Sequence, residues 1–359
     1  MSSVFRVVPA LVLLCTSTSC RQAESAQTVI ANPRWEVQYA DSSALFIGLF
    51  AVDSNVVWAA GSGGRVARTI DGGTTWTVRV VPGADSLQFR DVQGFSANDA
   101  VVLSIGNGPS SRIYRTSDGG KTWTLAFRNE DPKAFFDCLA FWDRERGFAF
   151  SDSHDGEFTL IRTDDGGRTW QRIDPSKVPD ARPGEGAFAA SGTCTVARPG
   201  GLGWFGTGAS GVDTRVVRTT DYGATWHDVK TPIASRSTGE GIASLTFLDD
   251  RHGMAFGNRL AGPDSTYANV ARTTDGGATW TLTRSQALGG VVYGGSYVPG
   301  AATPTLVVVG PSGSAYSTDD GDSWTRIDST NTWTVMFISP TAGWSAGRGH
   351  ISRFRHGAQ

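Results

Sequence analysis

The sequence predicts an all-β protein folded as a seven-bladed β-propeller whose last blade is closed by the N-terminal strand. Three observations support this prediction. An eight-residue motif occurs six times, its copies lie about one four-stranded blade apart, and strand-like segments at both ends of the chain have no partner within a complete repeat. A repeat of this period is typical of propellers, in which each repeat folds into one small antiparallel sheet.

The motif reads S/T-x-D-x-G-x-T/S-W, and its first copy is Thr69-Ile-Asp71-Gly-Gly73-Thr-Thr75-Trp76. A short carboxylate can accept hydrogen bonds from nearby backbone N–H groups and hold a tight turn closed. The glycine permits a positive φ, and the tryptophan begins the next strand with a large apolar ring. A catalytic residue does not need six equivalents, so we expect the six motif aspartates to be structural: Asp71, Asp118, Asp165, Asp221, Asp275 and Asp319.

Successive motif aspartates are 47, 47, 56, 54 and 44 residues apart. Each interval holds an apolar run, a turn, a second run ending in glycine and a third run that enters the motif, which predicts short antiparallel strands. After the last motif, segments 333–338, 343–347 and 350–354 predict three strands without a fourth. The orphan segment 35–39 resembles the strands that follow the motifs, so we expect it to complete a seventh blade and remove an unpaired edge. The alternative is six blades with an appended hairpin.

The composition and the N-terminal residues indicate which ligands and which cellular compartment to expect for this protein. The net charge is −2, charged residues make up 18% of the chain, and no run of lysine or arginine occurs, which argues against nucleic-acid binding. Residues 1–20 have Arg6 before a short apolar stretch, which predicts an export signal rather than a membrane-spanning helix. A short linker, 21–32, would then precede a single propeller domain, 33–357.

Residues 17–20 resemble a bacterial lipobox, although Ser17 replaces the usual aliphatic residue. This predicts lipidation at Cys20, and signal cleavage near residues 25–26 is the alternative. We expect a monomer in the periplasm or outer envelope, in contact with a membrane only through that lipid.

The two remaining cysteines, Cys138 and Cys194, fall in the predicted first strands of neighbouring blades. First strands lie side by side around the channel, so in an oxidising compartment the two could form a disulfide. Two buried free thiols are the alternative.

Binding residues are expected on the propeller face that carries the inter-blade connections and the loops between second and third strands, because irregular loops usually carry function. Polar residues gather there in the second to fourth blades, at Arg90, Asp91, Asp137, Asp152, His154, Asp155 and Glu185. They could bind a cation or a polar ligand, or pair carboxylates for acid–base chemistry. The alternative is a solvated rim, in which residues 154–157 form an ordinary hairpin turn.

An arginine precedes five of the motifs. A basic ring for an anionic partner is one interpretation. We favour a structural interpretation, in which each arginine covers a tryptophan ring or pairs with a carboxylate. These residues are Arg68, Arg115, Arg162, Arg218 and Arg272.

The motif resembles the Asp-box, or BNR repeat, which occurs in sialidases and in many proteins without hydrolase activity. The extended pattern R-T-x-D-G-G-x-T-W, with segments 135–143, 150–156 and 184–194, resembles the photosystem II stability and assembly factor family of seven-bladed Asp-box propellers, and most closely its exported bacterial branch. The resemblance implies a non-enzymatic scaffold that binds an unknown protein partner. We expect no cofactor, because the chain lacks the glycine-rich phosphate loop of dinucleotide-binding folds.

Two other classes of function remain as alternatives. A sialidase-like glycosidase would need an arginine triad and a tyrosine nucleophile paired with glutamate. Tyr293 is suitably placed, but only Arg90 and Arg259 are candidates for the triad, and the early Arg-Ile-Pro segment is absent. A receptor for a metal or a small ligand would use Asp137, Asp152, Asp155 and Glu185.

Overall fold

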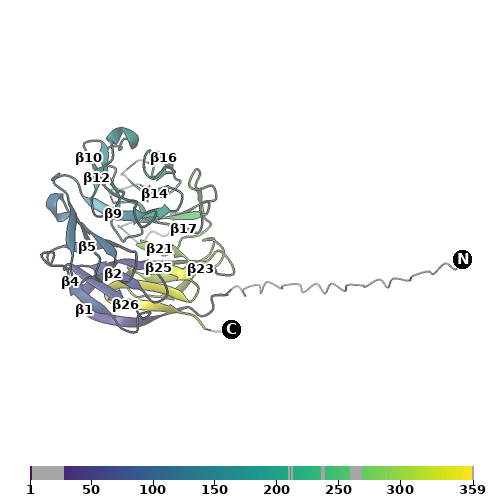
Figure 1. Ribbon diagram of the computed structural model, residues 1–359. Coiled ribbons are helices and arrows are strands. Elements are labelled where there is room, and N and C mark those ends of the chain that lie inside the picture. Colours follow the sequence, from purple (N-terminus) through teal and green to yellow (C-terminus); the bar gives the residue numbers. More distant parts are fainter. Residues whose placement is uncertain are drawn as a thin grey trace.

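The computed structural model describes residue 1 and residues 28–208, 211, 213–235, 239–258, 269–289 and 291–357. They form an all-β propeller of antiparallel sheets arranged around a common axis (Figure 1). The expected signal segment 1–20 with its Cys20, most of the expected linker and Arg259 lie outside the described residues. The last residues of that linker are described, and Ile30 is buried against Val298 and Val307. In the described ranges no helix is long and apolar enough to cross a membrane.

Six sheets make up the propeller, and two short 3-10 helices, η1 (Gly108–Ser110) and η2 (Pro175–Lys177), lie in its connections. Sheet 1 has the order β25 (Thr332–Ser339), β26 (Ala342–Arg355), β1 (Arg34–Ala51), β2 (Val57–Gly61), β3 (Arg65–Thr69), β4 (Thr77–Val80). Sheet 2 is β5 (Gln88–Gly94), β6 (Ala100–Ile105), β7 (Arg112–Thr116), β8 (Thr124–Arg128), and sheet 3 is β9 (Phe136–Phe141), β10 (Gly147–His154), β11 (Glu157–Thr163), β12 (Gln171–Arg172). Sheet 4 is β13 (Thr195–Arg198), β14 (Leu202–Gly206), β15 (Arg215–Thr219), β16 (His227–Lys230). Sheet 5 is β17 (Gly241–Phe247), β18 (Gly253–Asn258), β19 (Val270–Thr273), β20 (Thr281–Leu282), and sheet 6 is β21 (Gly294–Tyr297), β22 (Leu306–Gly310), β23 (Gly313–Ser317), β24 (Thr325–Asp328).

The prediction of seven blades is wrong, because the described residues form six sheets and the C-terminal strands belong to sheet 1. β1 pairs with β26 from Arg34 to Leu45 and then with β2 from Phe46 to Ala51. Residues 40–45 include no glycine or proline to end the strand, so β1 runs from one pairing into the other without a break. Purple β1 accordingly lies beside yellow β26 in Figure 1. The arrangement is closer to the alternative of six blades with an appended hairpin.

The six motif turns share one pattern of hydrogen bonds. In the first, the Thr69 hydroxyl donates to Asp71 Oδ1 at 2.8 Å and accepts from the Gly73 N–H at 2.9 Å. Thr75 donates to the same carboxylate from its N–H at 2.9 Å and from its hydroxyl at 2.6 Å. The Gly73 backbone has a φ of 91°. The same contacts occur at Asp118, Asp165, Asp221, Asp275 and Asp319, so each of these carboxylates is committed to its own turn.

The arginines that precede the motif turns connect neighbouring sheets rather than forming a free basic ring. Arg115 donates to the Gly166 carbonyl of the next turn at 3.0 Å, and Arg218 donates to that of Gly276 at 3.2 Å. Arg353 of β26 closes the ring, because its Nη1 donates to the Gly72 carbonyl at 2.7 Å. Arg162 differs, since it pairs with Asp164 at its own turn.

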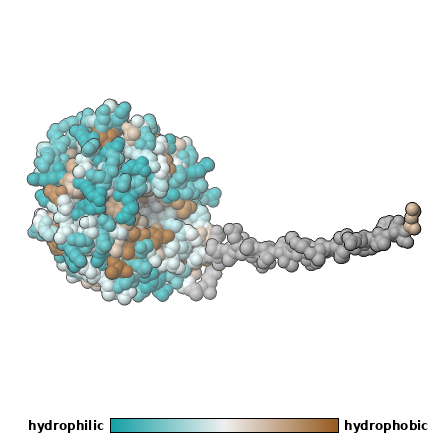
Figure 2. All heavy atoms as spheres, viewed as in Figure 1, coloured by the Kyte–Doolittle hydropathy of each residue, from teal (hydrophilic) through white to brown (hydrophobic). Residues whose placement is uncertain are grey.

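The hydrophobic core lies in layers between neighbouring sheets. One layer packs Phe148 and Phe150 of sheet 3 against Phe205 of sheet 4. Large exposed apolar side chains stand singly on separate elements, for example Val80 and Leu125, and hydrophilic residues dominate the face seen in Figure 2. Because the large exposed apolar side chains are scattered over separate elements, attention falls on the channel.

Neighbouring inner strands are joined by hydrogen bonds around the channel. A side chain on one inner strand accepts a hydrogen bond from a backbone N–H of the neighbouring inner strand. That N–H lies at the edge of its sheet and would otherwise be unpaired. The pairs are Leu139 N–H to Asp91 Oδ2 at 2.8 Å, Gly295 N–H to Ser244 Oγ at 3.0 Å, Tyr297 N–H to Thr246 Oγ1 at 3.2 Å and Phe337 N–H to Ser296 Oγ at 3.1 Å.

Candidate functional site

β-Bulges in the inner strands place side chains at one mouth of the channel. The pairing of β5 with β6 skips Arg90, that of β9 with β10 skips Asp137, and that of β25 with β26 skips Trp333. A bulge inserts one residue and redirects its side chain, and bulges are enriched next to binding sites. All three residues lie near the start of their strands, at the end of the channel opposite the motif turns. We call this end the loop-face mouth.

Arg90, Trp333 and Tyr293 form a compact group at the loop-face mouth. The Arg90 guanidinium lies 5.3 Å from the centre of the Trp333 ring, and the Trp333 and Tyr293 rings are 4.5 Å apart. Arg90 donates to the Gln88 side chain at 3.0 Å and to the Ala189 carbonyl. In the described ranges no carboxylate lies within ion-pair distance of Arg90, and burial lowers the pKa of its guanidinium to about 10. A partly desolvated cation beside two half-buried aromatic rings is therefore available to a ligand.

Asp137 is a buried carboxyl beneath this group, with 1% of its surface exposed. Burial raises its pKa well above the usual range, and the Asp152 carboxylate adds to the rise, while Arg90 and nearby backbone N–H groups oppose it. Its Oδ2 accepts no hydrogen bond from any described residue. A buried polar atom without a partner is uncommon, and it marks Asp137 as a group with unused hydrogen-bonding capacity.

A connection between sheets 3 and 4 crosses the channel below the mouth, and we call residues 186–194 the plug. Its Ala187 N–H donates to Asp152 in sheet 3 at 2.7 Å, and its Ala189 carbonyl accepts from Arg90 in sheet 2. On the far side, the Ser191 hydroxyl donates to the Tyr293 carbonyl at 2.7 Å, just before sheet 6. The Thr193 carbonyl accepts the Leu245 N–H of sheet 5 at 2.8 Å. The plug thus joins five sheets across the channel.

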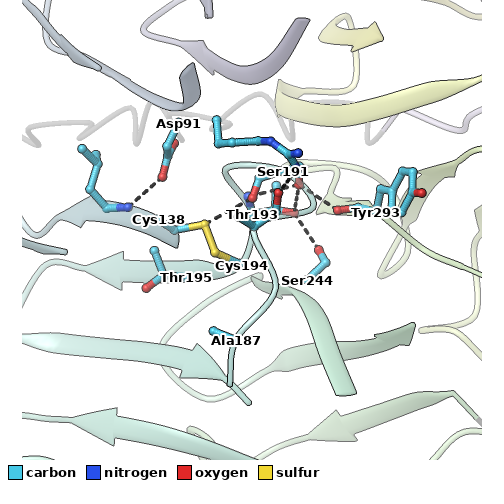
Figure 3. The surroundings of a disulfide bond; sticks show 12 residues. Asp91, Cys138, Ala187, Ser191, Thr193, Cys194, Thr195, Ser244 and Tyr293 are labelled. Carbon is cyan, nitrogen blue, oxygen red and sulfur yellow. Dashed lines mark hydrogen bonds between the residues drawn. A yellow bond between two sulfur atoms is a disulfide. The ribbon is translucent and has the colours of Figure 1, made fainter. Parts of the chain in front are cut away.

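A disulfide holds the end of the plug. Cys138 of β9 and Cys194 at the end of the plug are bonded, with their Cα atoms 6.3 Å apart, and both are buried (Figure 3). The Thr193 and Ser244 hydroxyls are hydrogen-bonded at 2.8 Å beside it. A covalent bond and several hydrogen bonds therefore hold the plug in place among the inner strands.

Glu185, which the sequence places with the binding residues, is an anchor for the connection that enters the plug. Its carboxylate receives two hydrogen bonds of 2.6 Å from Arg215, and the two side chains are 1% and 4% exposed. Thr207 donates to it at 2.6 Å and the Arg182 N–H at 2.8 Å. A carboxylate so fully paired has no capacity left for a ligand.

Of the remaining predicted site residues, Asp91 lies on β5 and accepts the Leu139 N–H, whereas the other three lie beside the plug or on the rim. Asp152 accepts the Ala187 N–H, and burial raises its pKa. His154 and Asp155 belong to a hairpin turn, where Asp155 has a φ of 53° and pairs with Lys133 at 2.7 Å, with both side chains exposed. A rim cavity of about 540 Å³ lies between this turn and the 181–186 segment.

The arrangement brings Arg90 and Asp137 to one mouth and leaves Asp155 and Glu185 elsewhere. No group of three or more His, Cys, Asp or Glu residues that could hold a metal occurs in the described ranges. Tyr293, the residue considered as a glycosidase nucleophile, has its ring on Trp333, and no described carboxylate hydrogen-bonds to its hydroxyl. The described channel mouth therefore offers recognition by charge and stacking more readily than acid–base chemistry.

Sequence reasoning missed Trp333, Ser191 and Arg215. Trp333 lies within an apolar run that reads as an ordinary strand, and the bulge that turns it to the mouth has no marker in the sequence. Arg215 lies 30 residues from Glu185 and resembles the other strand arginines. Ser191 follows Ala189 and Ala190 and precedes Gly192, and nothing in this segment of small residues marks it as a link across the channel.

No protein-family model matches the chain, and no curated protein matches it. Among solved structures, the chain is similar to "YCF48 bound to D1 peptide", with a TM-score of 0.64 and 17% identity, covering 93% of this chain and 100% of that chain. It is also similar to YCF48 from Cyanidioschyzon merolae, with a TM-score of 0.61 and 16% identity over 90% of this chain and 99% of that one. A streptogramin B lyase has a TM-score of 0.64 and 14% identity, covering 91% and 98%. At such identities the likeness shows the propeller fold.

Proposed function

We propose that this protein is an exported, non-enzymatic scaffold that binds a segment of a partner protein at the loop-face mouth. The observation that carries the proposal is the group of Arg90, Trp333 and Tyr293, in which a half-buried guanidinium that pairs with no described carboxylate lies over the Trp333 ring, which packs against that of Tyr293. Tryptophan, tyrosine and arginine are the side chains that most often dominate binding energy at protein interfaces.

Two further observations support a binding role. The plug beside this group is held by the Cys138–Cys194 disulfide and by the hydrogen bond from Ser191 to the Tyr293 carbonyl, so the group is built on a fixed support. A preorganised surface loses less conformational entropy on binding than a mobile one. One solved propeller of similar fold, YCF48, is bound to a D1 peptide, which is a precedent for peptide recognition by this architecture. The export signal and the lipidation of Cys20 are proposed from the sequence alone.

The test is quantitative co-purification of the tagged mature protein from its native envelope. Trp333→Ala removes the ring under Arg90 and should reduce the recovered partner at least tenfold, since truncating an aromatic interface anchor costs about 2 kcal/mol or more. Leu125→Ala, on an exposed outer strand, is the matched control and should leave recovery unchanged. Equal recovery with both variants would place the interface elsewhere, and no partner with the unaltered protein would contradict the scaffold role.

A further inference from the structure

The channel end opposite the loop-face mouth holds a second cavity. Its volume is about 380 Å³, and Gly192 and Thr193 of the plug form part of its wall. Apolar side chains from several inner strands line it, including Leu49, Phe247 and Phe337. Sites for small molecules are typically roughly 300–1,000 Å³ and mostly apolar, with a few polar groups that orient the ligand. This cavity matches that description and shares none of Arg90, Tyr293 or Trp333.

One carboxyl, Asp91, lines the inner end of this cavity. It is 4% exposed, and its oxygens accept the Val92 and Leu139 N–H groups, both at 2.8 Å. A Cβ on Gly192 would come within 2.3 Å of Asp91 Oδ1, so the plug packs directly on the carboxyl. Each carboxylate oxygen has a second lone pair, and Asp91 lines the cavity, so its carboxylate has capacity for a further hydrogen-bond donor.

Asp91 has no cation to balance it. In the described ranges no arginine, lysine or histidine lies within ion-pair distance of it, and Arg198, also on the cavity wall, is paired with Asp250 at 2.9 Å. Burial raises the pKa of Asp91 to about 8, against the opposing effect of its two N–H donors. An isolated buried carboxyl is costly unless it is paired.

Accepting the Leu139 N–H does not by itself require a carboxyl at position 91. Ser244, Thr246 and Ser296 accept the equivalent N–H groups between other inner strands with neutral hydroxyls. A hydroxyl would hold the Leu139 N–H as well and would avoid the desolvation of a charge. We therefore expect the carboxyl of Asp91 to have a role, beyond accepting this N–H, that a hydroxyl could not fill.

We infer that this cavity binds a small organic amine, whose ammonium group pairs with Asp91 and whose apolar body fills the space among Leu49, Phe247 and Phe337. The ammonium supplies the missing cation, and the apolar body gains by leaving water. The inference is independent of the proposed function, because the residues lining this cavity do not include Arg90, Tyr293 or Trp333.

The experiment uses the mature protein with two probes of equal shape, 2-phenylethylamine and 2-phenylethanol, and measures their affinities by calorimetry. The amine should bind at least tenfold more tightly than the alcohol, and Asp91→Asn should abolish that preference. A control variant, Arg198→Gln, should retain it. An amine that binds no better than the alcohol, or a preference that survives in Asp91→Asn, would overturn the inference.

A second measurement covers the case in which Asp91→Asn does not fold. In the unaltered protein, nuclear Overhauser contacts should connect the aromatic protons of the amine with Phe247 and Leu49. Contacts only with residues of the loop-face mouth, or of the rim cavity near His154, would assign the amine to another site and refute the inference.

Discussion

Replacing Glu185 with alanine tests whether this residue is an anchor or a ligand-binding group. The change leaves Arg215 buried without its bidentate partner, although Asp228 remains 3.0 Å away. Removing one member of a buried ion pair costs about 3–5 kcal/mol, and the remaining Asp228 contact favours the lower end of that range. With an m value of about 3 kcal/mol/M for a chain of this size, the urea midpoint should fall by roughly 1 M.

Asp155→Ala is the matched control, because Asp155 was predicted for the same face but pairs with Lys133 where both side chains are exposed. Exposed pairs contribute little, so its midpoint should not change measurably. The assay is urea unfolding followed by tryptophan fluorescence, together with limited proteolysis of residues 174–194, which should be cut faster only in Glu185→Ala. Equal midpoints for the two variants would refute the anchoring role of Glu185.

Three further predictions concern the disulfide, the motif turns and the ring closure. The disulfide spans 56 residues, so Cys138→Ser with Cys194→Ser should cost about 4 kcal/mol in the unfolding free energy measured in urea, and a loss below about 1 kcal/mol would contradict its role. Hydrogen bonds from Thr75 and Thr122 lower the pKa values of Asp71 and Asp118 from 3.8 to about 2. These aspartates therefore contribute stability that is complete above pH 3.8 and is lost as the pH falls towards 2, and the melting temperature followed by circular dichroism should drop across that interval less steeply in Asp71→Asn. Arg353→Ala should lower thermal stability by about 2 kcal/mol, because it removes a charged hydrogen bond to the Gly72 carbonyl and a contact with the Trp344 ring, whereas Arg162→Ala should have a much smaller effect.

Much of the propeller could be predicted because its repeats are encoded locally. Each motif turn is closed by residues within a few positions of one another, as at Thr69, Asp71 and Thr75, so the sequence alone indicates turn and strand. The number of sheets could not be predicted in the same way. The number of sheets depends on whether β1 is interrupted between the part that pairs with β26 and the part that pairs with β2. Residues 40–45, which lie between these parts, include no residue that would force or prevent an interruption.

The candidate site was harder to predict because its geometry is not local. Glu185 and Arg215 meet across 30 residues, and the loop pattern that suggested a binding group could not show that the carboxylate was already paired. Arg90 and Asp137 were predicted to lie early in inner strands, and the structure places them there, in β5 and β9. Their position at the mouth, with Trp333, depends on bulges that the sequence does not mark.

Site-specific photocrosslinking tests the central claim, that a partner protein binds at the loop-face mouth. A photoreactive phenylalanine analogue would replace Trp333 in one variant and the exposed Leu125 of β8 in another, each expressed in the native envelope and irradiated. The account predicts one adduct of discrete mass from position 333 and none from position 125. Adducts from position 125 alone, or the same mixture from both positions, would contradict it.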